Sequence, residues 1–247
     1  MKLSEDVLAV VSQAQTDGNK LVLVGQLDRK LYQAVNKALE AAGGKWNRKE
    51  KAHVFDTDAS DRVDQMVLTG EVEVPKDEFN FFPTPPEVVE KLLGIAEIQE
   101  GMTVLEPSAG KGAIADACAA KGARVFCVEL MEDNVNHLKA KADIYNSVTH
   151  LDFLSLQFGR TYDRVVMNPP FLKQADIHHV KHALRFLNPE GLLVAVMSAG
   201  VKFRQNQLTV EFRELVKQRG GKILDLPEKS FKESGTNVVT VVVVIPA

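Results

Sequence analysis

The chain has 247 residues, of which 45% are hydrophobic and 26% charged, and these values are ordinary for a globular protein with a substantial core. The formal net charge of −3 argues against a surface that binds nucleic acid all over, but it leaves room for local basic patches. The only two cysteines, Cys118 and Cys127, lie in apolar stretches without a metal-ligand spacing.

Neither end of the sequence carries a targeting or membrane signal. Acidic residues occupy the start of the chain, where a signal peptide needs an apolar run. The longest apolar run, residues 238–245, is too short to cross a bilayer. We therefore expect a cytoplasmic protein without a membrane partner.

The first block, residues 1–75, has the pattern of a small α+β module. Residues 21–24 have the composition of a strand, and Asp28 then precedes a stretch with apolar residues at helical spacing. Gly43 and Gly44 end that helix. The order of these elements predicts a βαβ-like module.

The rest of the first block suggests a role but does not fix it. A polar turn containing Trp46, Arg48 and Lys49 leads to a short strand, and a second helix is expected near residues 61–68. The turn could press an aromatic ring and cations onto a nucleic-acid strand, but Trp46 could equally be a core residue. The charged segment 71–80 is expected to be a connector.

The second block, residues 76–247, alternates strand and helix patterns. Continuous apolar strands separated by helices imply a parallel sheet that is covered on both faces. The last two strand patterns are joined by a loop too short for a crossover helix, so we expect them to pair antiparallel at one edge. The predicted fold is a Rossmann-like α/β fold, with a mostly parallel sheet and a C-terminal antiparallel strand.

A glycine-rich turn follows the first strand of this block, in the sequence VLEPSAGKGAIADACA. Gly110 and Gly112 let the backbone turn tightly and approach a ligand where a helix begins. The next strand ends at Glu129, at the distance along the chain where a carboxylate binds ribose hydroxyls. The pattern predicts a ribose-bearing cofactor and leaves a nicotinamide dinucleotide and S-adenosylmethionine both open.

A second unusual turn follows a later strand, in the sequence DRVVMNPPF. Pro169 and Pro170 turn the end of a buried strand into a stiff, extended corner. The side-chain oxygen of Asn168 and the carbonyl of Pro169 form a fixed pair of acceptors for a conjugated amino group, and Phe171 can stack on a planar substrate. An ordinary Asn-Pro turn with a buried Phe is the alternative.

The sequence resembles the class I S-adenosylmethionine-dependent methyltransferases, and specifically the N6-adenine DNA methyltransferases with gamma-type motif order that bacteriophages and prophages carry. The resemblance covers about residues 80–247 and rests on FFPTPP (81–86), EPSAGKG (106–112), VEL (128–130), LDFL (151–154), NPPF (168–171) and SFKESGTNVVT (230–240).

The resemblance implies S-adenosylmethionine as cofactor. Thr84 would contact the methionine portion, Glu129 the ribose and Asp152 the adenine amino group. The implied cofactor residues are Thr84, Glu106, Pro107, Ser108, Ala109, Gly110, Gly112, Glu129, Leu130, Asp152, Phe153 and Asn168, and the implied catalytic residues are Asn168, Pro169, Pro170 and Phe171.

The same resemblance implies duplex DNA as partner, with the target adenine flipped out between Phe171 and Phe231. The basic patches at Lys45–Lys51, Lys202–Arg204 and Lys229–Lys232 would mostly contact phosphates, with Lys202, Arg204, Lys229 and Lys232 among the contacts. Because the chain ends soon after its last strand, without the long recognition domain of larger relatives, we expect a short or relaxed sequence context.

Other functions stay open on the sequence alone. RNA adenine and protein glutamine methyltransferases also carry an NPP[FY] motif, although the EPSAG form of the loop favours nucleic acid. A nicotinamide-dependent dehydrogenase or a non-catalytic DNA-binding protein is a more distant alternative. Of the three histidines His178, His179 and His182, the first and last share a helix face, but no third ligand is in view for such a pair, so we expect no metal. The sequence does not indicate an oligomeric state.

Overall fold

The computed structural model describes residues 1–55, 58–72, 82–157, 159, 161–228, 230–234 and 238–247. The expected connector 71–80 and the boundary between residues 75 and 76 lie largely outside these ranges, so the boundary stays a prediction. No helix in the described ranges is long and apolar enough to cross a bilayer.

The N-terminal module is built on a four-stranded sheet in the order β1-β2-β4-β3, with every pair antiparallel. Its elements are α1 (Glu5–Ser12), β1 (Gln15–Asp17), β2 (Lys20–Val22), α2 (Arg29–Ala41), β3 (Lys45–Asn47), β4 (Ala52–Val54) and α3 (Ala59–Thr69). The sheet is therefore not βαβ-like. Its short strands join as hairpins, which require antiparallel pairing.

The helix predicted after Asp28 is confirmed. The Asp28 carboxylate accepts hydrogen bonds from the backbone N–H groups of Lys30 and Leu31, at 2.9 and 3.0 Å, and so caps the first turn of α2. Helix α1 was not predicted, although Ser4 caps it in the same way.

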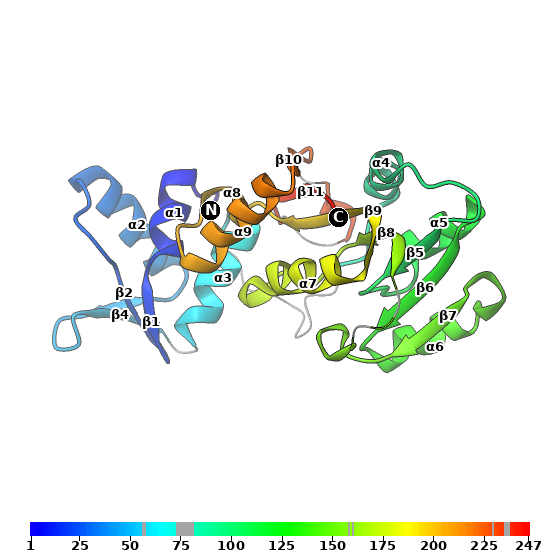
Figure 1. Ribbon diagram of the computed structural model, residues 1–247. Helices are drawn as coiled ribbons and strands as arrows, with labels where there is room; N and C mark the ends of the chain where they lie inside the picture. The colour runs from blue at the N-terminus through cyan, green and yellow to red at the C-terminus, as the bar shows by residue number, and fades with distance from the viewer. Residues whose placement is uncertain (56–57, 73–81, 158, 160, 229, 235–237) are drawn as a thin grey trace.

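The second block forms a seven-stranded sheet in the order β10-β11-β9-β8-β5-β6-β7 (Figure 1). Strands β5 to β9 are mutually parallel, and β11 pairs antiparallel with both β9 and β10. The predicted Rossmann-like fold with an antiparallel C-terminal strand is confirmed. The strands are β5 (Thr103–Glu106), β6 (Arg124–Glu129), β7 (Ser147–His150), β8 (Tyr162–Met167), β9 (Leu187–Ser198), β10 (Lys222–Asp225) and β11 (Thr240–Pro246).

Helices cover both faces of this sheet. The α-helices are α4 (Pro86–Ala96), α5 (Ala113–Ala120), α6 (Glu132–Lys139), α7 (Ala175–Ala183), α8 (Gly200–Phe203) and α9 (Gln207–Gln218), and the short 3-10 turns are η1 (Ala142–Ile144), η2 (Phe153–Ser155), η3 (Leu172–Gln174), η4 (Leu184–Phe186) and η5 (Lys232–Ser234).

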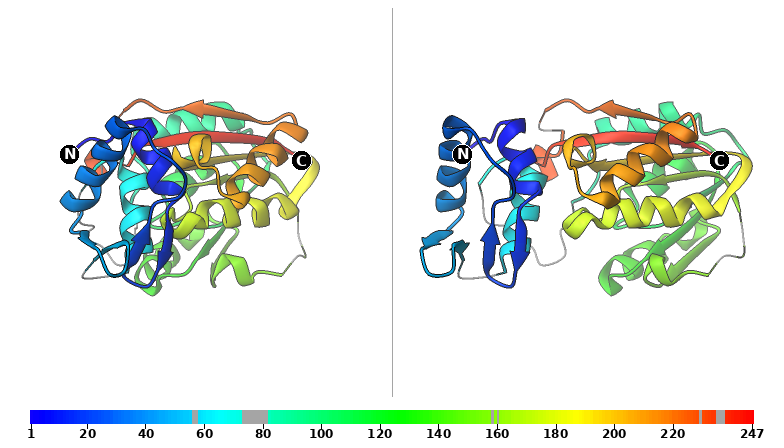
Figure 2. Two further views of the ribbon diagram at one scale, coloured as in Figure 1. Left: turned by 90° about the vertical axis from the view of Figure 1, so that its left-hand side faces the viewer. Right: turned by 60° about the vertical axis from the view of Figure 1, so that its left-hand side comes forward.

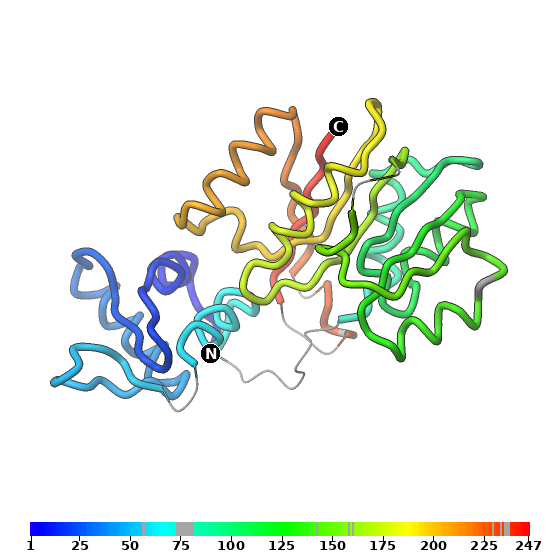
Figure 3. The backbone as a smooth tube through the Cα atoms, turned by 60° about the horizontal axis from the view of Figure 1, so that its bottom comes forward, coloured from blue at the N-terminus to red at the C-terminus, as the bar shows by residue number. Residues whose placement is uncertain are grey.

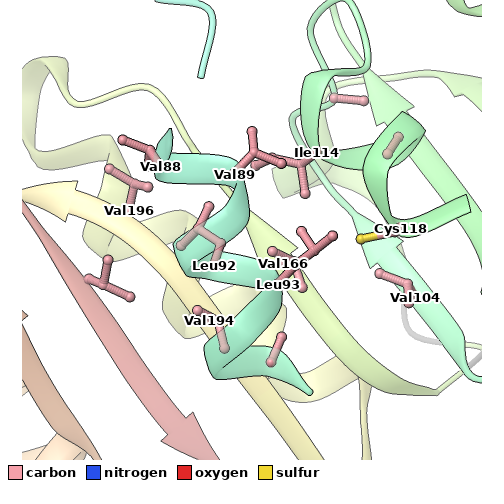
Figure 4. Packing of buried hydrophobic residues seen from close by; sticks show 14 of the residues in the cluster. Val88, Val89, Leu92, Leu93, Val104, Ile114, Cys118, Val166, Val194 and Val196 are labelled. Atoms are coloured by element: carbon pink, nitrogen blue, oxygen red, sulfur yellow. The ribbon is translucent and has the colours of Figure 1, made fainter. Parts of the chain in front are cut away.

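Alternation along each strand separates two cores. Leu92 and Leu93 of α4 pack against one face of the sheet, beside Val166 of β8 (Figure 4). Met167, the next residue of β8, points to the other face and packs with α7 and α9. Because strands buried on both faces read as unbroken apolar runs, they were visible in the sequence.

Helix α3 joins the module to the second block. Val67 belongs to the core of the module, whereas Leu68 belongs to the core on the α4 face of the large sheet, and its carbonyl accepts the N–H of Val239 at 3.0 Å. Figure 2 shows the module standing beside the large sheet. The two parts therefore meet through a packed helix.

A buried ion pair lies in this junction. Arg204 is only 4% exposed, and its guanidinium lies 3.3 Å from the Asp64 carboxylate of α3. Asp176, in the first turn of α7, also attracts it. Burial raises the pKa of Asp176 to about 7 and raises that of Asp64, while the positive charge of Arg204 lowers both. One cation thus stabilises two buried carboxylates.

Replacing Arg204 with Met should lower the free energy of unfolding by about 3 kcal/mol at pH 8, because it leaves buried carboxylates without their cation. The folded-state pKa of each acid rises further in the variant. The difference in unfolding free energy between the wild type and the variant should therefore be small at low pH, where both acids are protonated. It should grow as the pH rises through the folded-state pKa values of Asp64 and Asp176. Urea unfolding at pH 5 and pH 8 measures both effects.

Lys202→Ala provides the control, because Lys202 forms an exposed ion pair with Asp225. Such a pair contributes about 0–1 kcal/mol, and its loss should show little dependence on pH in this range. Equal unfolding curves for Arg204→Met and the wild type at pH 8 would show that Arg204 does not stabilise the buried carboxylates of the junction.

Candidate active site at the carboxyl edge of the sheet

A cavity of about 320 Å³ opens where the parallel strands end. This is the edge at which open α/β sheets bind ligands. The sequence-predicted residues that line it are Thr84, Glu106, Pro107, Ser108, Ala109, Gly110, Glu129, Leu130, Asp152, Phe153, Asn168, Pro169, Pro170 and Phe171. The fold thus brings five separate segments of the chain to one cavity.

The glycine-rich loop after β5 is held by the acid that ends β6. Both oxygens of the Glu129 carboxylate accept backbone hydrogen bonds at 2.7 Å, one from Gly110 and the other from Met131. A carboxylate has lone pairs left after two such bonds, so Glu129 can still accept a ligand hydroxyl. This one side chain fixes two walls of the cavity.

Gly112 does not line the cavity but makes the turn possible. Its φ of +90° is in the left-handed region, and a Cβ there would lie 2.6 Å from the Tyr145 hydroxyl. Gly112 immediately precedes α5. The predicted need for glycine at this position therefore has a local steric cause.

Glu106 leaves a buried acceptor unused. The side chain is 2% exposed, and its Oε2 atom has no hydrogen-bond partner among the described residues. Burial raises the pKa of Glu106 well above its ordinary value, and the nearby acids Asp116 and Glu129 add to the rise. A cationic ligand group in the cavity would supply the missing partner. The cavity therefore fits a ligand that carries positive charge.

The amide of Asn168 has a fixed orientation. Its Nδ2 atom donates to the Phe82 carbonyl at 3.2 Å and to the Thr84 hydroxyl at 3.1 Å. Its Oδ1 atom is buried and has no partner within the described part of the chain. Since both donor positions are occupied, the free group is an acceptor on the wall of the cavity. It suits a ligand N–H.

Asp152 and Phe153 form another wall. The Asp152 carboxylate accepts the N–H of Leu154 at 2.9 Å, which caps η2 and leaves the rest of this exposed side chain free. Phe153 is buried, and its ring packs against His182 with centroids 4.8 Å apart. The pair offers one polar and one apolar contact to a planar ligand.

Sequence reasoning missed some of the lining: Phe82, Pro83, Lys111, Ala113, Met131, Leu151 and His179. His179 is the most informative of these. Its Nδ1 atom lies 2.8 Å from the Ala175 carbonyl, and burial lowers its pKa, so the ring is neutral at pH 7 with Nδ1 as the donor. In the sequence it was one of three neighbouring histidines, and only a metal site was considered for them, because His178 and His182 share a helix face. No group of three metal-ligating side chains gathers within the described ranges.

Of the expected substrate residues, Phe171 lines the cavity and the other described ones do not. Phe231 is fully buried in the same core cluster as Phe171, and it does not line the cavity. Arg204 is buried in the junction with α3, so it is not a surface cation. Lys202 is paired with Asp225, Lys232 is exposed away from the cavity lining, and Lys229 lies outside the described residues. Arg204 was predicted as a surface cation, but its ion pair with Asp64 across the junction allows it to be buried.

The chain has relatives of known family. A family model described as the methyltransferase small domain matches residues 91–224. No curated protein sequence matches.

Solved structures share the fold at low sequence identity. A Vibrio vulnificus chain described as a modification subunit of a type I restriction enzyme is similar at a TM-score of 0.59 and 15% identity, over 69% of this chain and 45% of that chain. This chain thus spans less than half of the Vibrio chain. A Listeria monocytogenes chain described as a class I S-adenosylmethionine-dependent methyltransferase has a TM-score of 0.56 and 15% identity, over 76% and 67% of the two chains.

A third similar structure is a Pyrococcus horikoshii chain described as an RNA methyltransferase. Its TM-score is 0.51 and its identity is 22%, over 71% of this chain and 92% of that chain. At these identities the likeness concerns the fold.

Binding of S-adenosylmethionine should release protons through Glu106. The ligand carries an ammonium group and a sulfonium, and either beside Glu106 favours the ionised carboxylate, whose pKa is raised in the free protein. The affinity should therefore rise with pH up to that raised pKa and then level off. At pH values below the raised pKa of Glu106, calorimetry in two buffers with different ionisation enthalpies should give different binding enthalpies.

Glu106→Gln should weaken binding at least tenfold and remove the buffer dependence. Glu132→Gln is the matched control, because Glu132 is exposed in the first turn of α6. A wild-type binding enthalpy that is the same in both buffers, across this pH range, would show that Glu106 does not face the cationic part of the ligand.

Proposed function

Because the chain belongs to the methyltransferase small domain family and takes its methyl group from S-adenosylmethionine, we propose that it methylates the N6 amino group of adenine in DNA. The observation that carries this proposal is the buried, unpartnered Oδ1 atom of Asn168. This oxygen can accept a hydrogen bond from a substrate amino group, and a conjugated amine, whose nitrogen is a poor nucleophile, gains most from such a bond.

An adenine amino group is a weak nucleophile because its lone pair is delocalised into the ring. Asn168 Oδ1 and the Pro169 carbonyl would accept its two N–H protons, which draws the nitrogen toward a tetrahedral geometry and returns electron density to it. Two prolines and the hydrogen bonds to Phe82 and Thr84 hold these acceptors before the substrate arrives, so little reorganisation is needed. The site thus activates the amine by hydrogen bonding alone.

When bound, S-adenosylmethionine supplies an electrophilic methyl group on a sulfonium. Asn168 and Pro169 would orient the substrate nitrogen toward that methyl carbon, and the sulfur would leave with the electron pair of the broken carbon–sulfur bond. Asn168 is not basic enough to take the extra proton, which therefore passes to water. Positioning by the cavity wall supplies much of the remaining acceleration.

Cofactor binding falls to the residues along β5, β6 and β7. Glu129 would accept the ribose hydroxyls, Glu106 would pair with positive charge, and Asp152 with Phe153 would hold the adenine ring of the cofactor. All four residues line the cavity, which supports these proposed roles.

The planar substrate would lie against Phe171, which lines the cavity at 4% exposure. Phe231 belongs to the buried cluster that supports Phe171, so we propose that it backs the stacking ring rather than forming the opposite wall. The adenine must leave its stack to enter, as for other enzymes that modify bases.

RNA adenine and protein glutamine are the alternative substrates, since both present a conjugated amine. The resemblance of the EPSAG loop to DNA methyltransferases favours nucleic acid. The similar structures include one chain described as a modification subunit of a type I restriction enzyme and another described as an RNA methyltransferase, so the fold does not choose between DNA and RNA. Within DNA we propose a short or relaxed sequence context.

Wild-type protein given labelled S-adenosylmethionine with DNA, RNA and bulk protein should transfer label mainly to DNA, as N6-methyladenine. Asn168→Ala should lower that rate by at least 100-fold while changing cofactor affinity little, the scale for removing one preorganised polar contact. Mass spectrometry of the digested nucleosides identifies the product.

Asn136→Ala on the exposed face of α6 is the control and should transfer at the wild-type rate. Label confined to RNA or protein would assign the alternative substrate. An active Asn168→Ala protein would refute the role of the amide on any substrate.

A further inference from the structure

The hairpin formed by β3, its turn and β4 is an exposed basic surface. We call residues 45–54 the basic hairpin. Its cations Lys45, Arg48, Lys49 and Lys51 are all exposed, and none forms an ion pair with a described residue. Its one acid, Glu50, is already paired with Lys20 of β2 at 2.5 Å. The hairpin therefore keeps an uncompensated positive charge in a chain of net charge −3.

The only tryptophan of the chain stands on this hairpin. Trp46 is 49% exposed, so it is not the core residue that the sequence also allowed. It packs against His53 of β4, with ring centroids 5.2 Å apart. His53 is buried, its Nε2 atom lies 2.8 Å from Asn36 Oδ1, and burial lowers its pKa. A fixed, neutral ring thus supports an indole that is half open to solvent.

The turn that presents the cations has a defined shape. The Asn47 side chain accepts hydrogen bonds from the N–H groups of Lys49 and Glu50, at 3.0 and 3.3 Å. Lys51 then takes a left-handed conformation with φ of 51°. A partner would meet a formed surface, which lowers the entropic cost of binding.

The module that carries the hairpin is held at the same edge of the sheet as the cavity. Strand β8 ends directly before Asn168, and the η3 turn that follows contacts α3 through Lys173 and Asp61, 3.1 Å apart. Figures 1 and 3 show that the N-terminal module lies beyond the C-terminal ends of β8 and β9. The buried pair of Arg204 and Asp64 fixes it there.

We propose that the basic hairpin binds an unpaired nucleic-acid strand, with the cations on phosphates and Trp46 stacked on a base. This inference rests on the proposed function in taking nucleic acid as the substrate class. A paired duplex hides the faces of its bases, and an acidic peptide has no planar base for the indole. Only an unpaired strand uses both features of the surface.

The fluorescence of Trp46 reports the contact directly, because no other tryptophan contributes. Titration of the full chain with a single-stranded adenine-containing oligonucleotide should quench it. Duplex of the same sequence should quench it less, and polyglutamate should not. The apparent affinity, from anisotropy of a labelled strand, should fall linearly with salt on logarithmic axes. Trp46→Ala should weaken binding about tenfold.

Charge variants test the phosphate contacts. The triple change Arg48→Gln, Lys49→Gln and Lys51→Gln should lower the magnitude of the salt slope by about two, at about 0.7 for each phosphate contact with a single strand. The matched control changes Lys121, Lys217 and Lys222 to Gln, which are exposed and lie where β6 and β10 begin, at the opposite edge of the sheet. Its slope should equal that of the wild type.

Absent quenching, equal quenching by duplex or polyglutamate, or an unchanged slope in the hairpin triple variant would each overturn the inference. The titration needs no methyl transfer and can be repeated with Asn168→Ala. Strand binding without methylation of any nucleic acid would therefore refute the proposed function alone. Methylation of DNA by a protein whose hairpin variants bind and react normally would refute this inference alone.

Discussion

The orientation of one amide controls the chemistry available to this site. Asn168 donates both of its N–H bonds to Phe82 and Thr84, so among the described residues its buried oxygen is left as an unpaired acceptor in a residue that lines the cavity. A buried acceptor without a partner costs free energy, on the order of 1–3 kcal/mol, and a hydrogen-bond donor that reached it would relieve that cost. The site is thus arranged to bind an N–H donor at the end of β8.

The surrounding carboxylates give the cavity its preference for a cationic cofactor. Glu106 and Glu129 are both nearly buried, at 2% and 7% exposure, and they lie at the ends of adjacent strands. Glu129 is stabilised by two backbone N–H groups, whereas Glu106 has a free oxygen and a raised pKa. A sulfonium ligand with an ammonium group compensates charge that the protein alone leaves unbalanced. Within the described ranges, Glu106 and Asn168 therefore each present an unpaired acceptor oxygen on neighbouring loops, the first charged or chargeable and the second neutral.

The sequence predicted those parts of the fold and site that depend on local signals. Glu129 ends a strand, Gly112 and Asn168 come after strands, and parallel strands bring such positions to one edge. The order of elements also predicted the antiparallel last strand, because a short loop cannot hold a crossover.

Contacts between distant segments were beyond the reach of the sequence. The Phe82 carbonyl is a backbone group, so its residue type does not indicate that it binds Asn168. His179 lies in a helix with two other histidines, and nothing in the sequence marked it as the one that lines the cavity. Arg204 looked like a surface cation because its partner Asp64 lies 140 positions away in the chain. The module was expected to be βαβ-like because hairpins of three-residue strands leave almost no periodic pattern.

The most direct test of the amide's role is a double-mutant cycle on Thr84 and Asn168. Thr84→Val removes the hydroxyl that orients the amide and should lower the single-turnover rate, whereas Thr84→Ser should restore most of it. If Thr84 acts through Asn168, the double variant with Asn168→Ala should be no slower than Asn168→Ala alone. Losses that multiply independently in the double variant would contradict the account, because Thr84 would then contribute to the rate without orienting the amide.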